Sequence, residues 1–213
     1  MVELNRYRAI VGSDEAGKGE WLGPMTIAAV ALTPEQRSYL VTQGVMDSKE
    51  LKDETIEILF KVISKNCLSY HGITISPKRF NELFHDVKRE GRSLNDILAW
   101  AHAKAISQVY QELKRKGVSG KIRLVIDEFD RLKTEERPKR VLELKDLDYI
   151  QKPRAEEETA VAAASIMARM LRDLWIDEAS KRLDLDLRNI SAVEALTHKY
   201  AESFAKIGFL KHK

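Results

Sequence analysis

One stretch decides the fold and the chemistry of this chain: Gly12-Ser13-Asp14-Glu15-Ala16-Gly17-Lys18-Gly19-Glu20-Trp21-Leu22-Gly23-Pro24. It separates two apolar runs, residues 8–13 and 25–32, so the sequence predicts a strand, a loop and a second strand. Asp14 and Glu15 come at the end of the first predicted strand, where catalytic groups gather in open sheets. The glycines after them let backbone amides approach a phosphodiester or a ribose closely. An Asp-Glu pair is ordinarily a solvated turn, but this position favours a functional site.

The same residues partly fit a phosphate-binding loop. Residues 12–18 match the start of the motif GxxxxGK, in which Ser or Thr follows the lysine. Gly19 follows instead, so the hydroxyl that binds magnesium is missing, and Asp14 and Glu15 would repel the phosphates. The glycines are also one residue too widely spread for a dinucleotide-binding loop. Both alternatives are therefore disfavoured.

Helical and strand patterns alternate along the rest of the chain. The hydrophobic period predicts helices at residues 77–85, 93–116, 160–183 and 191–206, and one that begins with Asp53 as its N-cap. Strands are predicted at residues 67–75 and 122–126, and an exposed loop at 131–140. This order indicates an α/β layered fold. The length fits one domain, residues 1–213, with a helical C-terminal extension at about 184–213.

Carboxylates recur at two further places. Asp127 follows the apolar run 124–126, the same position that Asp14 has after the first strand. Glu156, Glu157 and Glu158 precede an alanine-rich helical segment, whose small side chains predict close packing against the sheet. Acidic residues in a first helical turn usually complement the helix dipole. Spacing alone therefore leaves a structural and a functional role open for these glutamates.

Composition excludes several classes of protein. A net charge of +3 and a pI near 8.8 permit a polyanionic partner without requiring one. Cys67 is the single cysteine, which excludes an internal disulfide and a thiolate zinc site and fits a reducing, cytoplasmic location. No apolar run approaches the roughly 18 residues that span a bilayer, so no membrane contact is expected.

Four motifs together resemble a known family. They are, in order, Gly12-Ser13-Asp14-Glu15-Ala16-Gly17-Lys18-Gly19, Asp47-Ser48-Lys49-Glu50-Leu51, Val125-Ile126-Asp127 and Ala162-Ala163-Ala164-Ser165-Ile166-Met167-Ala168-Arg169. Their order and approximate spacing are similar to those of the prokaryotic ribonucleases HII and HIII. Gly12-Ser13-Asp14-Glu15, Gly23-Pro24-Met25-Thr26 and Arg154-Ala155-Glu156 are closer to ribonuclease HIII, whereas Lys18 is nearer to the arginine of ribonuclease HII. The resemblance is therefore closer to ribonuclease HIII.

This resemblance implies a ribonuclease H-like fold, with a mixed central β-sheet flanked by helices and a small C-terminal helical region. It implies an endoribonuclease that hydrolyses the RNA strand of RNA/DNA hybrids and leaves 5'-phosphate and 3'-hydroxyl ends. The implied catalytic residues and metal ligands are Asp14, Glu15, Asp127 and Glu156. Glu157 stays open as the fourth, because the interval from Glu156 to the alanine motif is one residue short. Oxygen ligands suit two Mg²⁺ or Mn²⁺ ions.

The resemblance also implies how the substrate is held. Gly17, Lys18 and Gly19 match the loop that meets ribose 2'-hydroxyl groups, and Ser48 and Lys49 match a phosphate-contacting motif. The expected partner is an RNA/DNA hybrid, and the expected state is a monomer.

Two departures keep other functions open. Ribonucleases HIII commonly carry an N-terminal substrate-binding domain, whereas this sequence starts close to its first predicted catalytic strand. Residues 187–191 offer no convincing counterpart of the Lys-Gly-Tyr-Gly-Thr block or of the junction-sensing tyrosine of ribonuclease HII. The alternatives are a nucleic-acid-binding module with weak or no turnover and a metal nuclease that acts on DNA junctions. His102, inside a predicted helix, is expected to be packed rather than catalytic.

Overall fold

The computed structural model describes residues 7–46, 48–127, 147–152 and 155–210. For Glu50, Asp127, residues 147–152 and Glu156 it describes the backbone alone. The segment 131–140, for which the sequence predicts a loop, lies outside the described residues. Within the described part of the chain, every helix is too short or too polar to cross a bilayer.

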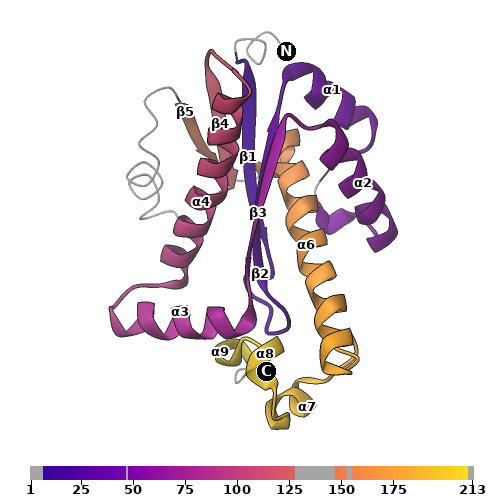
Figure 1. The fold of residues 1–213 in the computed structure, drawn as a ribbon, viewed down its shortest axis with the longest axis vertical. Helices are drawn as coiled ribbons and strands as arrows, with labels where there is room; N and C mark the ends of the chain where they lie inside the picture. The colour runs from indigo at the N-terminus through magenta and orange to yellow at the C-terminus, as the bar shows by residue number, and fades with distance from the viewer. Residues whose placement is uncertain (1–6, 47, 128–146, 153–154, 211–213) are drawn as a thin grey trace.

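A five-stranded mixed sheet forms the centre of the described chain (Figure 1). Its spatial order is β3 (Ser69–Ile75), β2 (Met25–Leu32), β1 (Ala9–Ala16), β4 (Ile122–Asp127) and β5 (Leu147–Lys152). β1, β2 and β3 are antiparallel neighbours, whereas β4 and β5 run parallel to β1. The predicted mixed sheet is therefore confirmed, although β5 was not predicted.

Two hydrophobic cores cover the two faces of the sheet. Alternate residues of a strand point to opposite faces. Val11 of β1 packs in the core with α4 (Leu94–Arg115), and Ile10 packs in the core with α6 (Thr159–Leu183). Figure 1 shows α4 on one side of the strands and α6 with α2 (Asp53–Asn66) on the other. A Cβ added at Gly12 would lie 2.2 Å from the carbonyl carbon of Ala160, so α6 packs against the sheet as closely as its alanines predict.

Three of the first four α-helices were predicted, and they differ from the prediction mainly at their ends. α1 (Pro34–Thr42) was not predicted, although Thr33 and Gln36 form a capping box at its start. α2 has Lys52 as its N-cap, so the prediction that Asp53 caps this helix is wrong by one residue. α3 (Pro77–Arg89) is a turn longer than predicted because Val87 extends its buried side. α4 has Ser93 as its N-cap, as predicted.

The C-terminal region is helical, but the single helix predicted at residues 191–206 is wrong. Three short helices replace it: α7 (Ala192–Thr197), α8 (Ala201–Phe204) and α9 (Ile207–Leu210). The backbone adopts an extended conformation at His198 and again at Ala205, which forms an antiparallel β-bridge with Leu22. Pairing with a distant segment therefore overrides the local helical period.

Candidate active site

Asp14 and Glu15 lie inside β1 rather than after it. The strand predicted at residues 8–13 continues to Ala16, because Asp14 and Glu15 pair with Ala28 and Ile27 of β2. Consecutive strand residues point to opposite faces, so Asp14 lies on the α6 face and Glu15 on the α4 face. Oδ1 of Asp14 also accepts a 2.8 Å hydrogen bond from the backbone N–H of Glu15. The expectation that both carboxylates follow the strand is thus corrected.

A buried hydrogen-bonded chain holds Glu15. His102 of α4 is 1% exposed; its Nε2 lies 3.1 Å from Oε2 of Glu15 and its Nδ1 lies 2.8 Å from Oγ of Ser13. Ser13 donates its hydroxyl hydrogen to the carbonyl of Ala28, so Nδ1 of His102 donates to Ser13. His102 is packed, as predicted, but its contact with Glu15 was not foreseen.

The surroundings of Glu15 favour its ionised form. Burial raises the pKa of Glu15, but the hydrogen bond and charge of His102, followed by Lys18, bring the pKa below its usual range. Nζ of Lys18 lies 3.5 Å from Oε1 of Glu15. Divalent cations bind ionised carboxylates, so Glu15 is chemically suited to the metal-binding role that the resemblance implies.

Asp14 lies beside the backbone position of Asp127. β1 and β4 are parallel neighbours, and Ser13 pairs with Ile126. Asp14 and Asp127 are the next residues of these two strands, so their backbones lie at the same end of the sheet. The side chain of Asp127 lies outside the described residues. Its convergence with Asp14 and Glu15 stays a prediction.

The three consecutive glutamates differ in their surroundings. Glu156 and Glu157 belong to a 3₁₀ helix, η3 (Ala155–Glu157), which contacts β4 and leads into α6. The side chain of Glu156 lies outside the described residues, and Glu157 is exposed. Glu158 is buried, and its Oε1 accepts a 2.7 Å hydrogen bond from Nε of Arg37 in α1. Glu158 therefore anchors the start of α6, and the choice between Glu156 and Glu157 as a ligand stays open.

The glycine loop (residues 17–24) connects β1 to β2 next to Glu15. Gly17 has φ +79°, and a Cβ there would lie 2.4 Å from the carbonyl oxygen of Pro24, so only glycine closes this loop. Gly19 is exposed, and a Cβ there would meet nothing within 4 Å, so its backbone is open to a ligand. Lys18 pairs with Glu15. The substrate contacts of Gly17, Lys18 and Gly19 stay predictions.

Ser48 and Lys49 lie in a 3₁₀ helix, η2 (Ser48–Glu50), that is fixed to α6. The hydroxyl oxygen of Ser48 is buried and lies 2.5 Å from that of Ser165, whereas Lys49 is exposed. One turn along α6, Arg169 donates to the backbone carbonyl of Ser48 and lies 2.5 Å from a carboxylate oxygen of Asp53. Ser165 and Arg169 therefore explain why the second and fourth sequence motifs occur together.

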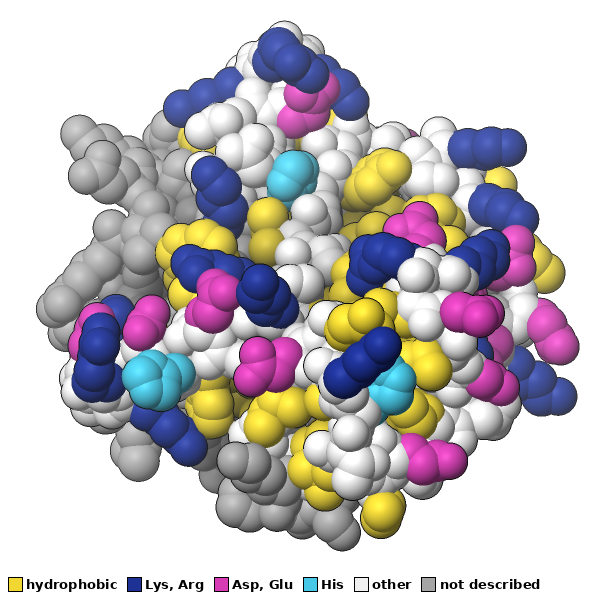
Figure 2. Space-filling view, turned by 60° about the horizontal axis from the view of Figure 1, so that its bottom comes forward, with side chains coloured by type: hydrophobic (Ala, Val, Ile, Leu, Met, Phe, Trp, Pro, Cys, Tyr) yellow, Lys and Arg dark blue, Asp and Glu magenta, His cyan; other side chains and the backbone are white. Residues whose placement is uncertain are grey.

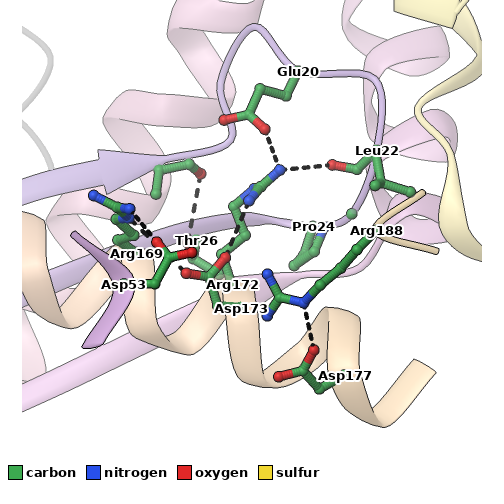
Figure 3. A network of polar contacts seen from close by, with 12 residues as sticks. Glu20, Leu22, Pro24, Thr26, Asp53, Arg169, Arg172, Asp173, Asp177 and Arg188 are labelled. Carbon is green, nitrogen blue, oxygen red and sulfur yellow. Dashed lines mark hydrogen bonds and ion pairs between the residues drawn. The ribbon is translucent and has the colours of Figure 1, made fainter. Parts of the chain in front are cut away.

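Ion pairs continue along α6 to the glycine loop (Figure 3). Arg172 donates to the carboxylate of Glu20 and, at 3.4 Å, to the carbonyl of Leu22. Burial raises the pKa of Asp173, although the neighbouring arginines oppose this rise. Arg169 and Arg172 are three residues apart, so they lie on one side of the helix and hold two separate loops. No role was predicted for either arginine, although their i, i+3 spacing indicates that both side chains lie on one side of the helix.

The described donor atoms fit a hard divalent cation. Asp14 and Glu15 supply carboxylate oxygens, which Mg²⁺ and Mn²⁺ prefer. Among the side chains that the structure describes, no group of three or more His, Cys, Asp or Glu could hold a metal ion. Asp127 and Glu156 fall outside that set. The complete ligand set stays a prediction.

Known proteins with similar sequences share one family. A family model described as Ribonuclease HII matches residues 11–208. Ribonuclease HIII of Protochlamydia amoebophila is 38% identical over 181 residues, which are 83% of this chain and 55% of that protein. Ribonuclease HIII of Chlamydia pneumoniae is 38% identical over 165 residues, which are 76% of this chain and 51% of that protein. The chain spans about half the length of these curated relatives.

A solved structure shares the fold. The crystal structure of Bst-RNase HIII in complex with Mn²⁺ has a TM-score of 0.78 and 22% sequence identity to this chain. The match covers 99% of this chain and 70% of that one. This similarity confirms the predicted ribonuclease H-like fold.

Proposed function

Because this chain belongs to the ribonuclease HII family, we propose that it is a metal-dependent endoribonuclease that hydrolyses the RNA strand of RNA/DNA hybrids. The family resemblance of the four sequence motifs is confirmed, including the closeness to ribonuclease HIII, which is the name of both relatives described above. The activity itself, the substrate and the metal ions are inferred for this chain from its own residues.

The placement of the acidic residues at one end of the sheet carries the proposal. Asp14 and the backbone of Asp127 lie at the same end of two adjacent parallel strands. The pKa of Glu15, the next residue along β1, lies below its usual range. η3, which contains Glu156, contacts β4. Although Asp14 and Glu15 point to opposite faces of the sheet, these placements bring the four carboxylate-bearing residues to one end of it and support a carboxylate site there.

We expect Asp14, Glu15, Asp127 and Glu156 to hold two Mg²⁺ or Mn²⁺ ions. Such ions, when bound, activate a water molecule and stabilise the charge that develops on the leaving 3'-oxygen. His102 orients Glu15 through the 3.1 Å contact, since hydrogen bonds to a ligand fix its position. Lys18 contacts the other oxygen of Glu15, so a cation bound there would displace Lys18 toward the phosphates of the substrate.

The glycine loop accounts for the choice of RNA. Proteins distinguish RNA from DNA by contacts to the 2'-hydroxyl, and the exposed backbone at Gly19 can supply them. Charge contributes less to this choice. On the face in Figure 2, Lys and Arg side chains lie among Asp and Glu side chains, without a continuous field of one sign among the described residues. This face offers no broad basic surface among the described residues, so local contacts at the loop are the proposed source of the specificity.

A cleavage assay tests the activity. Four duplexes of one sequence, each with one labelled strand, are compared in Mg²⁺ and in Mn²⁺: RNA/DNA hybrid labelled on RNA, the same hybrid labelled on DNA, duplex RNA and duplex DNA. We expect cleavage of the hybrid RNA strand alone, with 5'-phosphate and 3'-hydroxyl ends. Binding without cleavage supports a nucleic-acid-binding module instead. Cleavage of duplex DNA supports a DNA nuclease, and a branched DNA added as a fifth substrate would then show whether that nuclease acts on junctions.

A second assay assigns the fourth carboxylate. Glu156→Gln and Glu157→Gln change neighbouring residues of η3 by the same chemistry, so each is the control for the other. We expect Glu156→Gln to abolish cleavage and Glu157→Gln, at an exposed position, to leave it intact. The reverse result moves the ligand to Glu157, and two active variants rule out a four-carboxylate site.

A further inference from the structure

Lys206 is a buried lysine that contacts the glycine loop from the C-terminal region. Its side chain is 0% exposed. Nζ donates to the backbone carbonyl of Gly23 at 2.7 Å and lies 3.5 Å from that of Pro24. Pro24 is also the residue that Gly17 packs against across the loop. Lys206 therefore binds the end of the loop that faces the predicted ribose-contacting glycines.

The backbone around Lys206 pairs with the same loop. The N–H of Lys206 donates to the carbonyl of Trp21 at 2.7 Å, and the N–H of Gly23 donates to the carbonyl of Phe204 at 2.8 Å. Between these bonds, Leu22 and Ala205 form an antiparallel bridge. The segment 204–207 thus runs beside the glycine loop like a short strand, and the Lys206 side chain adds a further bond to it.

α3 fixes this segment from the other side. Nδ2 of Asn81 donates to the carbonyl of Ala205 at 3.0 Å, and Oδ1 accepts from the N–H of Ile207, also at 3.0 Å. One side chain therefore satisfies both backbone groups that flank Lys206. Because α3 belongs to the body of the fold, the segment 204–207 is a rigid support rather than a loose tail.

A lysine in this position costs stability that an apolar side chain would not. Burial, followed by the positive charge of Arg172, lowers the pKa of Lys206 to about 7, although the carboxylate of Glu20 opposes the shift. A methionine of similar length would fill the same volume without desolvating an amine. A destabilising buried group points to a role in positioning rather than in packing.

We propose that Lys206 is a positioning residue that fixes the Gly23–Pro24 end of the glycine loop, so that Gly17 and Gly19 meet the ribose of the bound strand. This inference rests on the proposed function. Lys206 does not touch the substrate; it acts through the Pro24 carbonyl against which Gly17 closes. Loss of its hydrogen bonds lets the loop adopt other conformations, which lowers the fraction of molecules ready to bind.

Lys206→Met tests the proposal, because it removes the donor and keeps the length of the side chain. Steady-state cleavage of an RNA/DNA hybrid should show a KM about tenfold higher, with kcat within about twofold, since a lost hydrogen bond is worth about one order of magnitude in affinity. Hydrogen exchange in residues 17–24 should be faster than in the wild type, while exchange in β1 and β2 stays unchanged.

Leu187→Ala is the matched control. Leu187 is buried in the C-terminal hydrophobic cluster on which Trp21 and Leu22 of the loop also pack, but its apolar side chain donates no hydrogen bond to the loop, so its truncation loosens the cluster and keeps the Lys206 bonds. The proposal requires this variant to keep the wild-type KM and the slow exchange of residues 17–24. Equal KM values for Lys206→Met and the wild type, or equal changes in both variants, would overturn it.

Asn81→Leu keeps the test decisive if Lys206→Met fails to fold. This half-buried side chain supports the segment from α3, so its loss should raise KM and loop exchange in the same direction by a smaller factor. Unchanged exchange in Asn81→Leu contradicts the support role. The exchange readout needs no turnover, so a chain that fails to cleave hybrids would refute the proposed function while the loop support is still measured.

Discussion

Nε2 of His102 lies 3.1 Å from Oε2 of Glu15, so a histidine buried under the sheet orients a predicted metal ligand on its central strand. The other ring nitrogen is held by Ser13, whose own hydrogen goes to Ala28. Metal ligands are commonly oriented by such neighbouring hydrogen bonds, and their loss weakens metal binding or activity by about 10-fold to 100-fold. His102 is therefore a positioning residue for Glu15.

Replacing His102 by Phe should lower kcat for hybrid cleavage by about 10-fold to 100-fold and leave KM nearly unchanged, because Glu15 loses its orienting partner. His102→Gln, which can still donate a hydrogen bond, should recover part of the rate. Val109→Ala on the same helix is the control, since it removes buried volume without touching Glu15. Cleavage kinetics and urea unfolding of all three variants check this; an unchanged kcat in His102→Phe would refute the role.

The elements that local patterns decide were predicted correctly. The strand at residues 25–32 and the strand that ends at Asp127 match the structure, because residues 25–32 are buried throughout and nearly all apolar, and residues 124–126 are a short buried apolar run. The helices that became α4 and α6 also match, because α4 has a long periodic apolar face and α6 is rich in alanine, a strong helix former. Elements that depend on distant partners were wrong or missed: β1 extends through its pairing with β2, and the helix predicted at 191–206 breaks where Ala205 pairs with Leu22.

The residues of the candidate site were likewise predictable only where the signal is local. Asp14, Glu15 and Asp127 could be singled out because each closes an apolar run, which is a local signal. His102, Arg169, Arg172 and Lys206 look like ordinary residues of helices, and the partners discussed above lie 87 or more positions away in the chain, as in the pairs with Glu15 and Gly23. Their contacts follow from the packing of α4, α6 and the C-terminal segment around the sheet, which no local pattern specifies.

Gly12→Ala should destabilise the protein by about 3 kcal/mol or more, since its Cβ would lie 2.2 Å from the backbone of Ala160 and would push α6 from the sheet. Gly19→Ala is the control, because nothing lies within 4 Å of its added Cβ and its change in stability should stay within about 0.5 kcal/mol. Chemical denaturation measures both free energies of unfolding. Similar stabilities for the two variants would mean that α6 is not packed this closely.

Arg169→Met should raise KM for the hybrid several-fold and lower kcat less, because residues 48–53 lose the hydrogen bonds from Arg169 and keep the Ser48–Ser165 bond to α6, while the carboxylates stay in place. The loss of charged hydrogen bonds should also reduce stability by about 1–3 kcal/mol. Arg188→Met removes an exposed ion pair with Asp177 and should change neither KM nor stability by a measurable amount. If both arginine variants behave alike in kinetics, the loop at 48–53 does not contact the substrate.

The stability of the wild type should rise between about pH 7 and pH 10.5 relative to Lys206→Met. The folded chain releases the Lys206 proton at a pKa of about 7, whereas the unfolded chain keeps it to about 10.5, so the unfolded state binds more protons in this window. Each unit by which the folded and unfolded pKa values of Lys206 differ is worth about 1.4 kcal/mol in the free energy of unfolding. Urea unfolding at pH 7 and pH 9.5 compares the two proteins. If the difference between their free energies of unfolding is the same at both pH values, Lys206 titrates normally.

Single-turnover cleavage of a hybrid by Asp14→Asn, in Mg²⁺ and in Mn²⁺, tests the central claim most directly. Asparagine keeps the shape of Asp14 but removes the negative charge that a divalent ion needs, and Asp177→Asn on the exposed side of α6 is the matched control. We predict a rate at least about a thousandfold slower for Asp14→Asn, with unchanged binding of the hybrid in Ca²⁺ and a normal rate for Asp177→Asn. An Asp14→Asn protein that cleaves within about tenfold of the wild-type rate would contradict the metal-dependent carboxylate site.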